Sequence, residues 1–84
     1  MDSHTLTAAE IREICRLSDF RTRLLLDDPS LQFIKRHGPN GGAGKRFFTL
    51  RSVLRAIGDR PYFTREMKMA LCARDIRNRN MKHD

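Results

Sequence analysis

At 84 residues the chain has room for one small domain, and its 17 Lys and Arg against 10 Asp and Glu give a formal net charge of +7. A domain this small buries only about 60% of the surface of its unfolded chain, so it has little structure to spare for a deep catalytic cleft. No stretch approaches the roughly 20 apolar residues of a membrane-crossing helix, and no secretory signal is visible, so we expect a cytoplasmic protein without a membrane partner.

Two helices are predicted in the first third of the chain. Thr7 and Glu10 form a capping box, and the apolar residues behind it recur at helical spacing, which predicts a helix from about 8 to 16. Ser18 caps a second helix, which must end near Pro29 because proline removes a backbone donor. The apolar residues expected together on one side of this second helix are Phe20, Leu24 and Leu25.

A β-hairpin and two further helices are predicted in the rest of the chain. Residues 31–36 and 45–50 are short apolar stretches around a glycine-rich loop, which predicts the two strands of a hairpin. Thr49 then begins a helix that stops at Gly58, and a last helix follows Thr64 and runs to about 79. The predicted fold is therefore mainly α with a small β-hairpin, in the order helix, helix, hairpin, helix, helix.

The positive charge is unevenly distributed along the chain. Residues 1–29 carry more acidic than basic side chains, whereas residues 30–60 carry seven Lys and Arg beside Asp59 alone. Such asymmetry indicates a surface that faces a polyanion, and nucleic acid is the commonest one in the cytoplasm. A solvated surface that only keeps the protein in solution is the alternative.

The first two predicted helices are separated by only about two residues, which is the spacing of a helix-turn-helix. The second helix of that motif enters the DNA major groove with the polar side chains at its start, and Arg is the commonest base-reading residue. We assign to this recognition helix Ser18, Asp19, Arg21, Thr22 and Arg23. An ordinary helical hairpin with charged residues on its wet face has the same pattern.

Basic side chains bracket the glycine-rich loop of the predicted hairpin. A loop of small residues with cations on both sides suits a wing that follows the phosphate backbone of DNA. We assign to this wing Lys35, Arg36, Asn40, Lys45 and Arg46, and we expect phosphate contacts from the tail residues Arg74, Arg77 and Arg79. A hairpin with a glycine-rich turn and no ligand is the alternative.

Together these stretches resemble the winged helix-turn-helix of the MerR and excisionase-like superfamily. Residues 10–18 have the pattern of that family's first helix and turn, and residues 44–49, GKRFFT, resemble the exit of its wing. Val53 and Leu54 occupy the apolar positions of the helix that follows. The family usually has Val or Ile where this chain has Thr22.

The resemblance implies a sequence-specific protein for double-stranded DNA, with Arg46 on phosphate and residues 21–23 facing the major groove. Either a transcription regulator or an excisionase-type recombination directionality factor is expected, from a prokaryotic or phage setting. The alternatives are a DNA-recognition subunit for packaging and a basic RNA-binding or protein-adapter domain. We place the DNA-binding domain at residues 1–60 and a basic helix at 61–84. Its apolar residues serve either the core or cooperative self-association on DNA: Met67, Leu71 and Ile76.

Catalysis, cofactors and metals are not expected. The stretch from Pro39 to Arg46 resembles a phosphate-binding P-loop, but that motif needs Gly at the first position and Ser or Thr at the last. His4, His37 and His83 are widely scattered, and neither cysteine lies near one at the spacing of metal ligands. The sequence therefore predicts a binding protein and not an enzyme.

Overall fold

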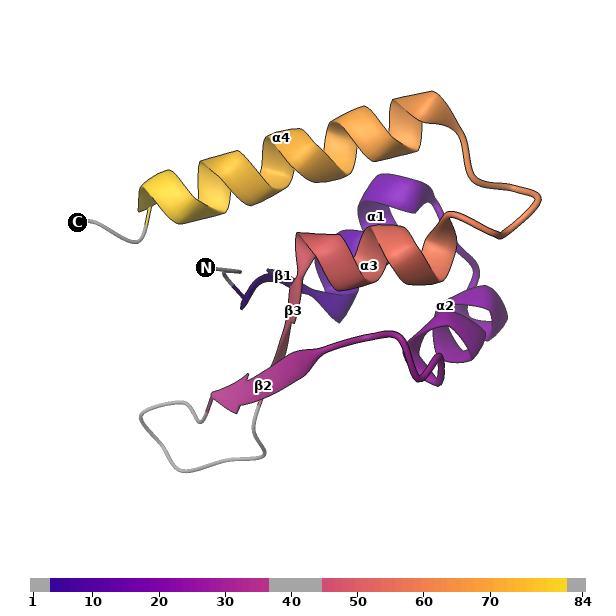
Figure 1. The fold of residues 1–84 in the computed structure, drawn as a ribbon, viewed down its shortest axis with the longest axis horizontal. Helices are drawn as coiled ribbons and strands as arrows, with labels where there is room; N and C mark the ends of the chain where they lie inside the picture. The colour runs from indigo at the N-terminus through magenta and orange to yellow at the C-terminus, as the bar shows by residue number, and fades with distance from the viewer. Residues whose placement is uncertain (1–3, 37–44, 82–84) are drawn as a thin grey trace.

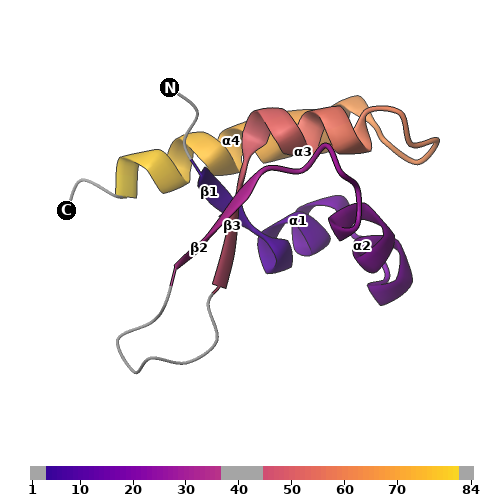
Figure 2. The same cartoon turned by 60° about the horizontal axis from the view of Figure 1, so that its bottom comes forward.

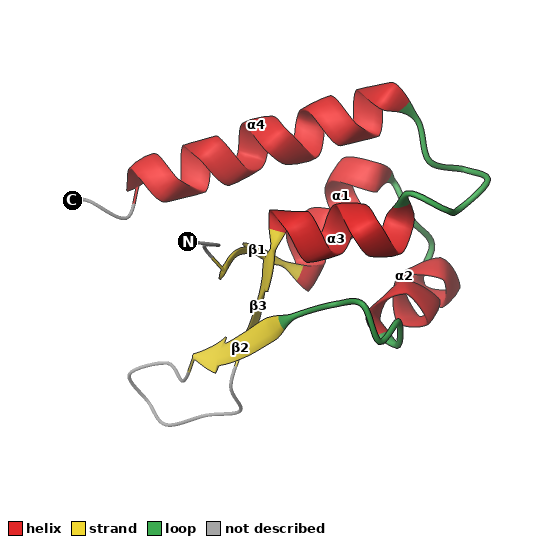
Figure 3. Cartoon of the chain, viewed as in Figure 1, coloured by secondary structure: helices red, strands yellow, loops and turns green. Residues whose placement is uncertain are grey.

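The computed structural model describes residues 4–36 and 45–81, and within them it contains four helices and a three-stranded antiparallel sheet (Figures 1 and 3). The mainly helical fold and the order of helix, helix, hairpin, helix, helix are confirmed, with one further strand at the start. The elements are β1 (His4–Thr7), α1 (Ala8–Cys15), α2 (Asp19–Leu26), β2 (Phe33–Arg36), β3 (Lys45–Thr49), α3 (Leu50–Ile57) and α4 (Arg65–Met81).

Hydroxyl side chains begin the first three helices, as predicted. Thr7 Oγ1 accepts the backbone N–H of Glu10 at 3.2 Å, and the Glu10 carboxylate accepts the backbone N–H of Thr7 at 3.0 Å. Ser18 and Thr49 each accept a backbone N–H three residues further on, at 3.1 and 3.2 Å. Each of these bonds satisfies a backbone donor that the helix itself leaves without a partner.

The turn between α1 and α2 contains a residue in the left-handed conformation. Arg16 has φ 52° and ψ 47°, and the N–H of the next residue, Leu17, donates to the carbonyl of Arg12 at 3.0 Å. This conformation costs a residue with a Cβ atom about 1–2 kcal/mol. The side chain of Leu17 is buried in the core. The packing of Leu17 therefore offsets the cost of the tight turn.

The sheet contains a strand that the sequence did not predict. β3 lies in the centre, with β1 antiparallel on one side and β2 antiparallel on the other. Leu6 of β1 lies opposite Phe48, and Thr7 lies opposite Phe47. The strand was missed because its four residues, HTLT, pair with a segment far along the chain and carry no local turn signal.

One hydrophobic core connects the helices to the sheet. Its fully buried side chains include Leu6, Ile11, Leu25, Phe48, Val53, Ile57 and Leu71. Leu71 comes from α4, which lies across the sheet and the other helices in both views (Figures 1 and 2). The predicted division at residue 60 therefore does not separate two cores.

Two apolar residues of α2 lie on the opposite side from the one predicted. Leu25 is buried, but Phe20 is 70% exposed and Leu24 is 46% exposed. Thr22 takes the inward position beside Leu25, at 9% exposure, and its hydroxyl donates to the carbonyl of Ser18 at 2.8 Å. With 3.6 residues per helical turn, positions 22 and 25 share one side and positions 20 and 24 share the other. The prediction that all three apolar residues face inward was wrong.

A buried carboxylate attaches α4 to β1. Asp75 is only 2% exposed, accepts a hydrogen bond from the hydroxyl of Thr5, and pairs with Arg79 one helical turn later at 2.9 Å. A buried charge is tolerated only when it is paired and hydrogen-bonded, and Asp75 meets both conditions.

A second carboxylate attaches α4 to α1. Besides its bond to Thr7, Glu10 accepts a hydrogen bond from the Asn78 amide and one from the Arg74 guanidinium, each at 3.0 Å. The Asn78 amide also donates to the backbone carbonyl of Thr5 at 3.0 Å. The capping residue of α1 is therefore also the contact point of α4.

Acidification should weaken this attachment. Burial acts to raise the pKa of Glu10, but the hydrogen bonds from Asn78, Thr7 and Arg74 outweigh it and hold the pKa below its ordinary value. In the unfolded chain the pKa of a Glu side chain is about 4.3. A carboxyl group with a lowered folded-state pKa stabilises the fold above its unfolded pKa, and this contribution is lost as the pH falls through the folded value.

We therefore expect the free energy of unfolding to decrease as the pH is lowered through the acidic range below the ordinary Glu pKa. Glu10→Gln should flatten this dependence, because the amide keeps the shape of the side chain but does not titrate. Urea unfolding at a series of pH values measures it, with Asp59→Asn, at an exposed carboxylate, as the control. A Glu10→Gln profile as steep as that of the unmodified protein would contradict the assignment.

Candidate nucleic-acid interface

The β2–β3 hairpin and α2 project on the same side of the molecule, with α1 between them and α4 on the other side (Figure 2). On that side α1, α2 and β3 enclose an open hollow of about 560 Å³. Three arginines from these three elements line it: Arg12, Arg23 and Arg46. Two carboxylates, Asp19 and Asp27, line it as well. We call this hollow, with its excess of arginine, the basic groove. The sequence predicted Arg23 and Arg46 as site residues but not Arg12.

The hairpin brings like charges directly opposite each other. Lys35 of β2 is the register partner of Arg46, and Arg36 is the partner of Lys45. All four side chains are exposed. Like charges at directly opposed positions destabilise an antiparallel pair. The arrangement is therefore unfavourable in the free protein, and a bound anion would relieve it.

Aromatic rings hold two of these cations in place. The guanidinium carbon of Arg46 lies 4.9 Å from the centre of the Phe33 ring, and that of Arg36 lies 5.1 Å from the centre of the Phe47 ring. Phe33 packs in turn against the buried ring of Phe48, with ring centres 5.7 Å apart. Stacking uses the face of a guanidinium and leaves the N–H donors in its plane for two oxygens of an anion such as phosphate.

The residues assigned to the recognition helix do not all face the same way. Arg23 lines the basic groove, as does Asp19, which pairs with Arg12 at 2.6 Å. The guanidinium carbon of Arg21 lies 4.9 Å from the centre of the ring of Tyr62. Tyr62 lies between α3 and α4 and does not line the groove.

Ser18 has the capping role that the sequence predicts, and Thr22 has a structural role that the sequence analysis did not assign to it. Ser18 begins α2 by accepting a backbone N–H, and Thr22 lies at the floor of the groove with its hydroxyl bonded within the helix. We therefore correct the set of side chains available to a base and leave these two out of it.

Two of the three tail arginines are bound to carboxylates. Arg74 pairs with Glu10 at 3.0 Å, and Arg79 pairs with Asp75 at 2.9 Å. Both are part of the attachment of α4. The sequence predicted that they contact phosphate, but in the structure they are paired with carboxylates. Arg77 is exposed and forms no ion pair with residues 4–36 or 45–81. The last predicted site residue, Asn40, lies outside the described residues, as does the glycine-rich loop around it.

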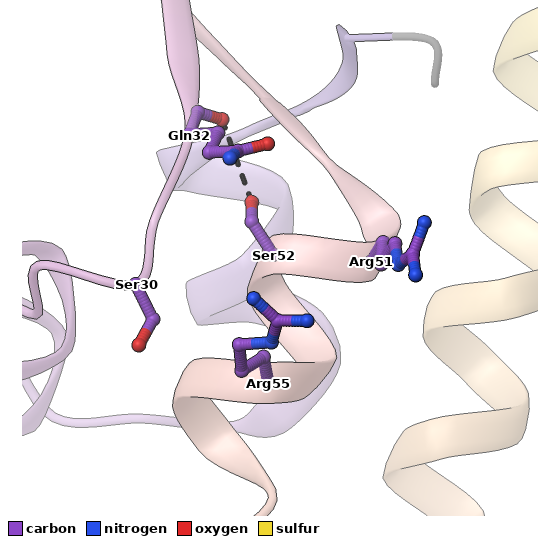
Figure 4. A pocket seen from close by; sticks show the side chains of 5 residues that line it. All are labelled: Ser30, Gln32, Arg51, Ser52 and Arg55. Carbon is purple, nitrogen blue, oxygen red and sulfur yellow. Dashed lines mark hydrogen bonds between the residues drawn. The ribbon is translucent and has the colours of Figure 1, made fainter. Parts of the chain in front are cut away.

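A second polar hollow, of about 240 Å³, lies between α3 and the segment before β2. Its lining is Ser30, Gln32, Arg51, Ser52 and Arg55 (Figure 4). Ser52 Oγ lies 3.4 Å from the backbone carbonyl of Gln32. Arg55 lies beside Ser30 and Ser52, whereas the guanidinium of Arg51 points away from them (Figure 4). The sequence analysis missed these two arginines, although their spacing of four residues on a helix was a usable signal.

Comparison of the chain with protein-family models, curated proteins and solved structures finds no match. Within residues 4–36 and 45–81, no group of three or more His, Cys, Asp or Glu is placed to hold a metal ion. No helix in this part of the chain is both long and apolar enough to cross a membrane.

Burial raises the pKa of the Cys15 thiol, which keeps it protonated and unreactive. What the described side chains offer is positive charge, along the hairpin and in the open hollow beside it.

Removing one charge from an opposed pair in the hairpin should stabilise the free protein. We expect Lys35→Gln to raise the free energy of unfolding by up to about 1 kcal/mol at low salt. The gain should shrink at higher salt, because the Debye length falls to about 10 Å at 0.1 M. Urea unfolding at two salt concentrations measures it. Lys68→Gln, at an exposed lysine of α4, is the control, and an equal gain in that variant would refute the role of the opposed pair.

Proposed function

We propose that this protein binds double-stranded DNA in a sequence-specific manner, as a small winged helix-turn-helix of the MerR and excisionase-like type. In this proposal α1 and α2 are the helix-turn-helix, α2 enters the major groove, and the β2–β3 hairpin is the wing. One observation carries the proposal. The tight helix pair, the basic groove and the cationic hairpin all lie on one side of the molecule (Figure 2). A duplex is a polyanion long enough to contact all three at once.

The burial of α2 supports the same proposal. The resemblance predicts an apolar residue at the position of Thr22, and Thr22 faces the core there beside Leu25. This sets the register of the second helix and directs Phe20, Arg23 and Leu24 outward.

Duplex DNA is favoured over single-stranded RNA by the use of the exposed aromatic rings. Proteins that bind single-stranded RNA stack unpaired bases on open aromatic faces. Here the rings of Phe33, Phe47 and Tyr62 each have an arginine over them, and among the described residues Phe20 is the widely exposed ring that has none. The cations are thereby oriented for phosphate, and the rings beneath them are already covered.

Two biological roles fit this binding activity. A transcription regulator occludes or activates a promoter, whereas a recombination directionality factor bends the DNA between recombination sites. DNA packaging is a third role that needs the same recognition. A circular-permutation gel assay for bending, beside protection of a promoter, separates the first two.

The hairpin cations should set the salt dependence of DNA binding. Each phosphate contact contributes about 0.9 to the slope of log K against log salt. We expect Arg46→Ala to weaken binding to all duplexes alike and to lower this slope by about one contact. Fluorescence anisotropy on a labelled duplex across a salt series measures both effects.

The control is Arg65→Ala, at an exposed residue of α4 that lines neither the basic groove nor the hairpin. An unchanged slope in Arg46→Ala would contradict the wing assignment. Absence of duplex binding by the unmodified protein would contradict the proposed function itself.

We also propose that a second copy binds the adjacent site on the duplex. A single DNA-binding module buries only about 600–1,000 Å² of its surface, which is little for selective binding. The residues proposed for this contact differ in part from those expected from the sequence. Leu71 belongs to the core and Met67 packs against it, so neither is available. The exposed apolar stripe of α4 is instead formed by Met69, Cys72, Ala73 and Ile76.

Cooperative binding should depend on this stripe. We expect Ile76→Gln to abolish cooperativity on a duplex with two adjacent sites and to leave affinity for a single site unchanged. Ala70→Gln, at an exposed position outside the stripe, is the control, and quantitative gel shifts distinguish singly and doubly occupied duplexes. Non-cooperative isotherms for the unmodified protein would rule out the second copy.

A further inference from the structure

Two large apolar side chains of α2 are exposed beside its charged ones. Phe20 is 70% exposed and Leu24, one turn later, is 46% exposed, opposite the buried pair Thr22 and Leu25. A large aromatic ring exposed to this extent loses most of the stabilisation that its burial would contribute. The fold does not account for Phe20 at this position, because Leu25 and Leu26 supply the apolar contacts of α2 with the core.

The charges of α2 do not explain its role as a groove-reading helix. The helix carries two cations, Arg21 and Arg23, and two carboxylates, Asp19 in its first turn and Asp27 at its C-cap. Asp19 already pairs with Arg12, and the Arg21 guanidinium already lies over Tyr62. The helix itself is therefore close to electrically neutral. Attraction to phosphate comes from the surfaces beside it.

One of those surfaces places cations beside the apolar pair. Arg23 lies between Phe20 and Leu24 in sequence and lines the basic groove, which continues to Arg46 on the hairpin. In a major groove, base edges likewise lie next to a rim of phosphates. An apolar patch on a partner protein does not call for this flanking charge, so we argue for the duplex as the occupant.

The major groove displays one apolar group, the C5-methyl of thymine. We propose that Phe20, with Leu24 beside it, reads thymine methyl groups and makes thymine part of the preferred site. This inference rests on the proposed function and adds the base that α2 selects. It also replaces a purely polar readout by Asp19, Arg21 and Arg23.

The test removes the methyl group and nothing else. A duplex is selected from a random pool by the unmodified protein, and a second duplex of the same sequence is made with deoxyuridine in place of thymidine. Charge and hydrogen-bonding edges are the same in both. We expect the unmodified protein to bind the deoxyuridine duplex about fourfold more weakly for each methyl group contacted.

Phe20→Ala should bind the two duplexes equally well, and Phe20→Leu should retain part of the discrimination. Met81→Ala removes a 60% exposed apolar side chain from the end of α4, outside the stripe, and should discriminate as the unmodified protein does. The exposure of Phe20 makes these variants safe for folding, which thermal unfolding verifies.

The outcomes separate the inference from the function beneath it. Equal binding of both duplexes by the unmodified protein, or discrimination that survives Phe20→Ala, overturns the reading of thymine and leaves duplex binding intact. Failure of the unmodified protein to enrich or bind any duplex overturns the proposed function. Binding of a protein partner that Phe20→Ala abolishes, with equal affinity for both duplexes, assigns the apolar pair to that partner instead.

Discussion

The carboxylate of Glu10 connects the two ends of the chain and determines how α1 is attached to α4. It closes the capping box with Thr7, which sets where α1 begins, and it accepts hydrogen bonds from Arg74 and Asn78 of α4. Two residues later, Arg12 points into the basic groove, because two helical positions are rotated by roughly 200°. One helix thus holds the long C-terminal helix with one side and presents a cation with the other.

The hairpin illustrates how a binding surface is made at the expense of local stability. Two directly opposed pairs of cations repel each other, yet the strands remain together because Phe48 is anchored in the core and Phe33 packs on it. The same ring then supports Arg46 from below. Stability comes from one end of the strands, and charge is collected at the other.

Sequence alone was sufficient where the determining interaction was local. The starts of α1, α2 and α3 followed from Thr7, Ser18 and Thr49, whose partners lie three residues away. The hairpin followed from its glycine-rich loop. The pair of Arg79 with Asp75, one helical turn apart, was also readable in principle and was overlooked.

Sequence failed where the determining contact was distant. β1 exists because β3 pairs with it, and Arg74 is bound because Glu10 comes to it from the other end of the chain. In the eight-residue α2, apolar residues lie on both sides, so only the packing of Thr22 and Leu25 decides that Phe20 stays outside. The site residues themselves remain predictions, since they depend on a ligand that lies outside the chain.

One feature of the sheet gives the basic residues a second consequence. β2 pairs with β3 on one side only, so within the described residues it is an edge strand, and all four of its side chains are exposed. An open edge with Phe33 and Ile34 is a template for strand pairing between molecules, and charged residues are the usual protection against it. Lys35 and Arg36 therefore act as gatekeepers. The positive charge for which we propose a polyanion partner thus also disfavours edge-to-edge pairing between separate copies of the chain.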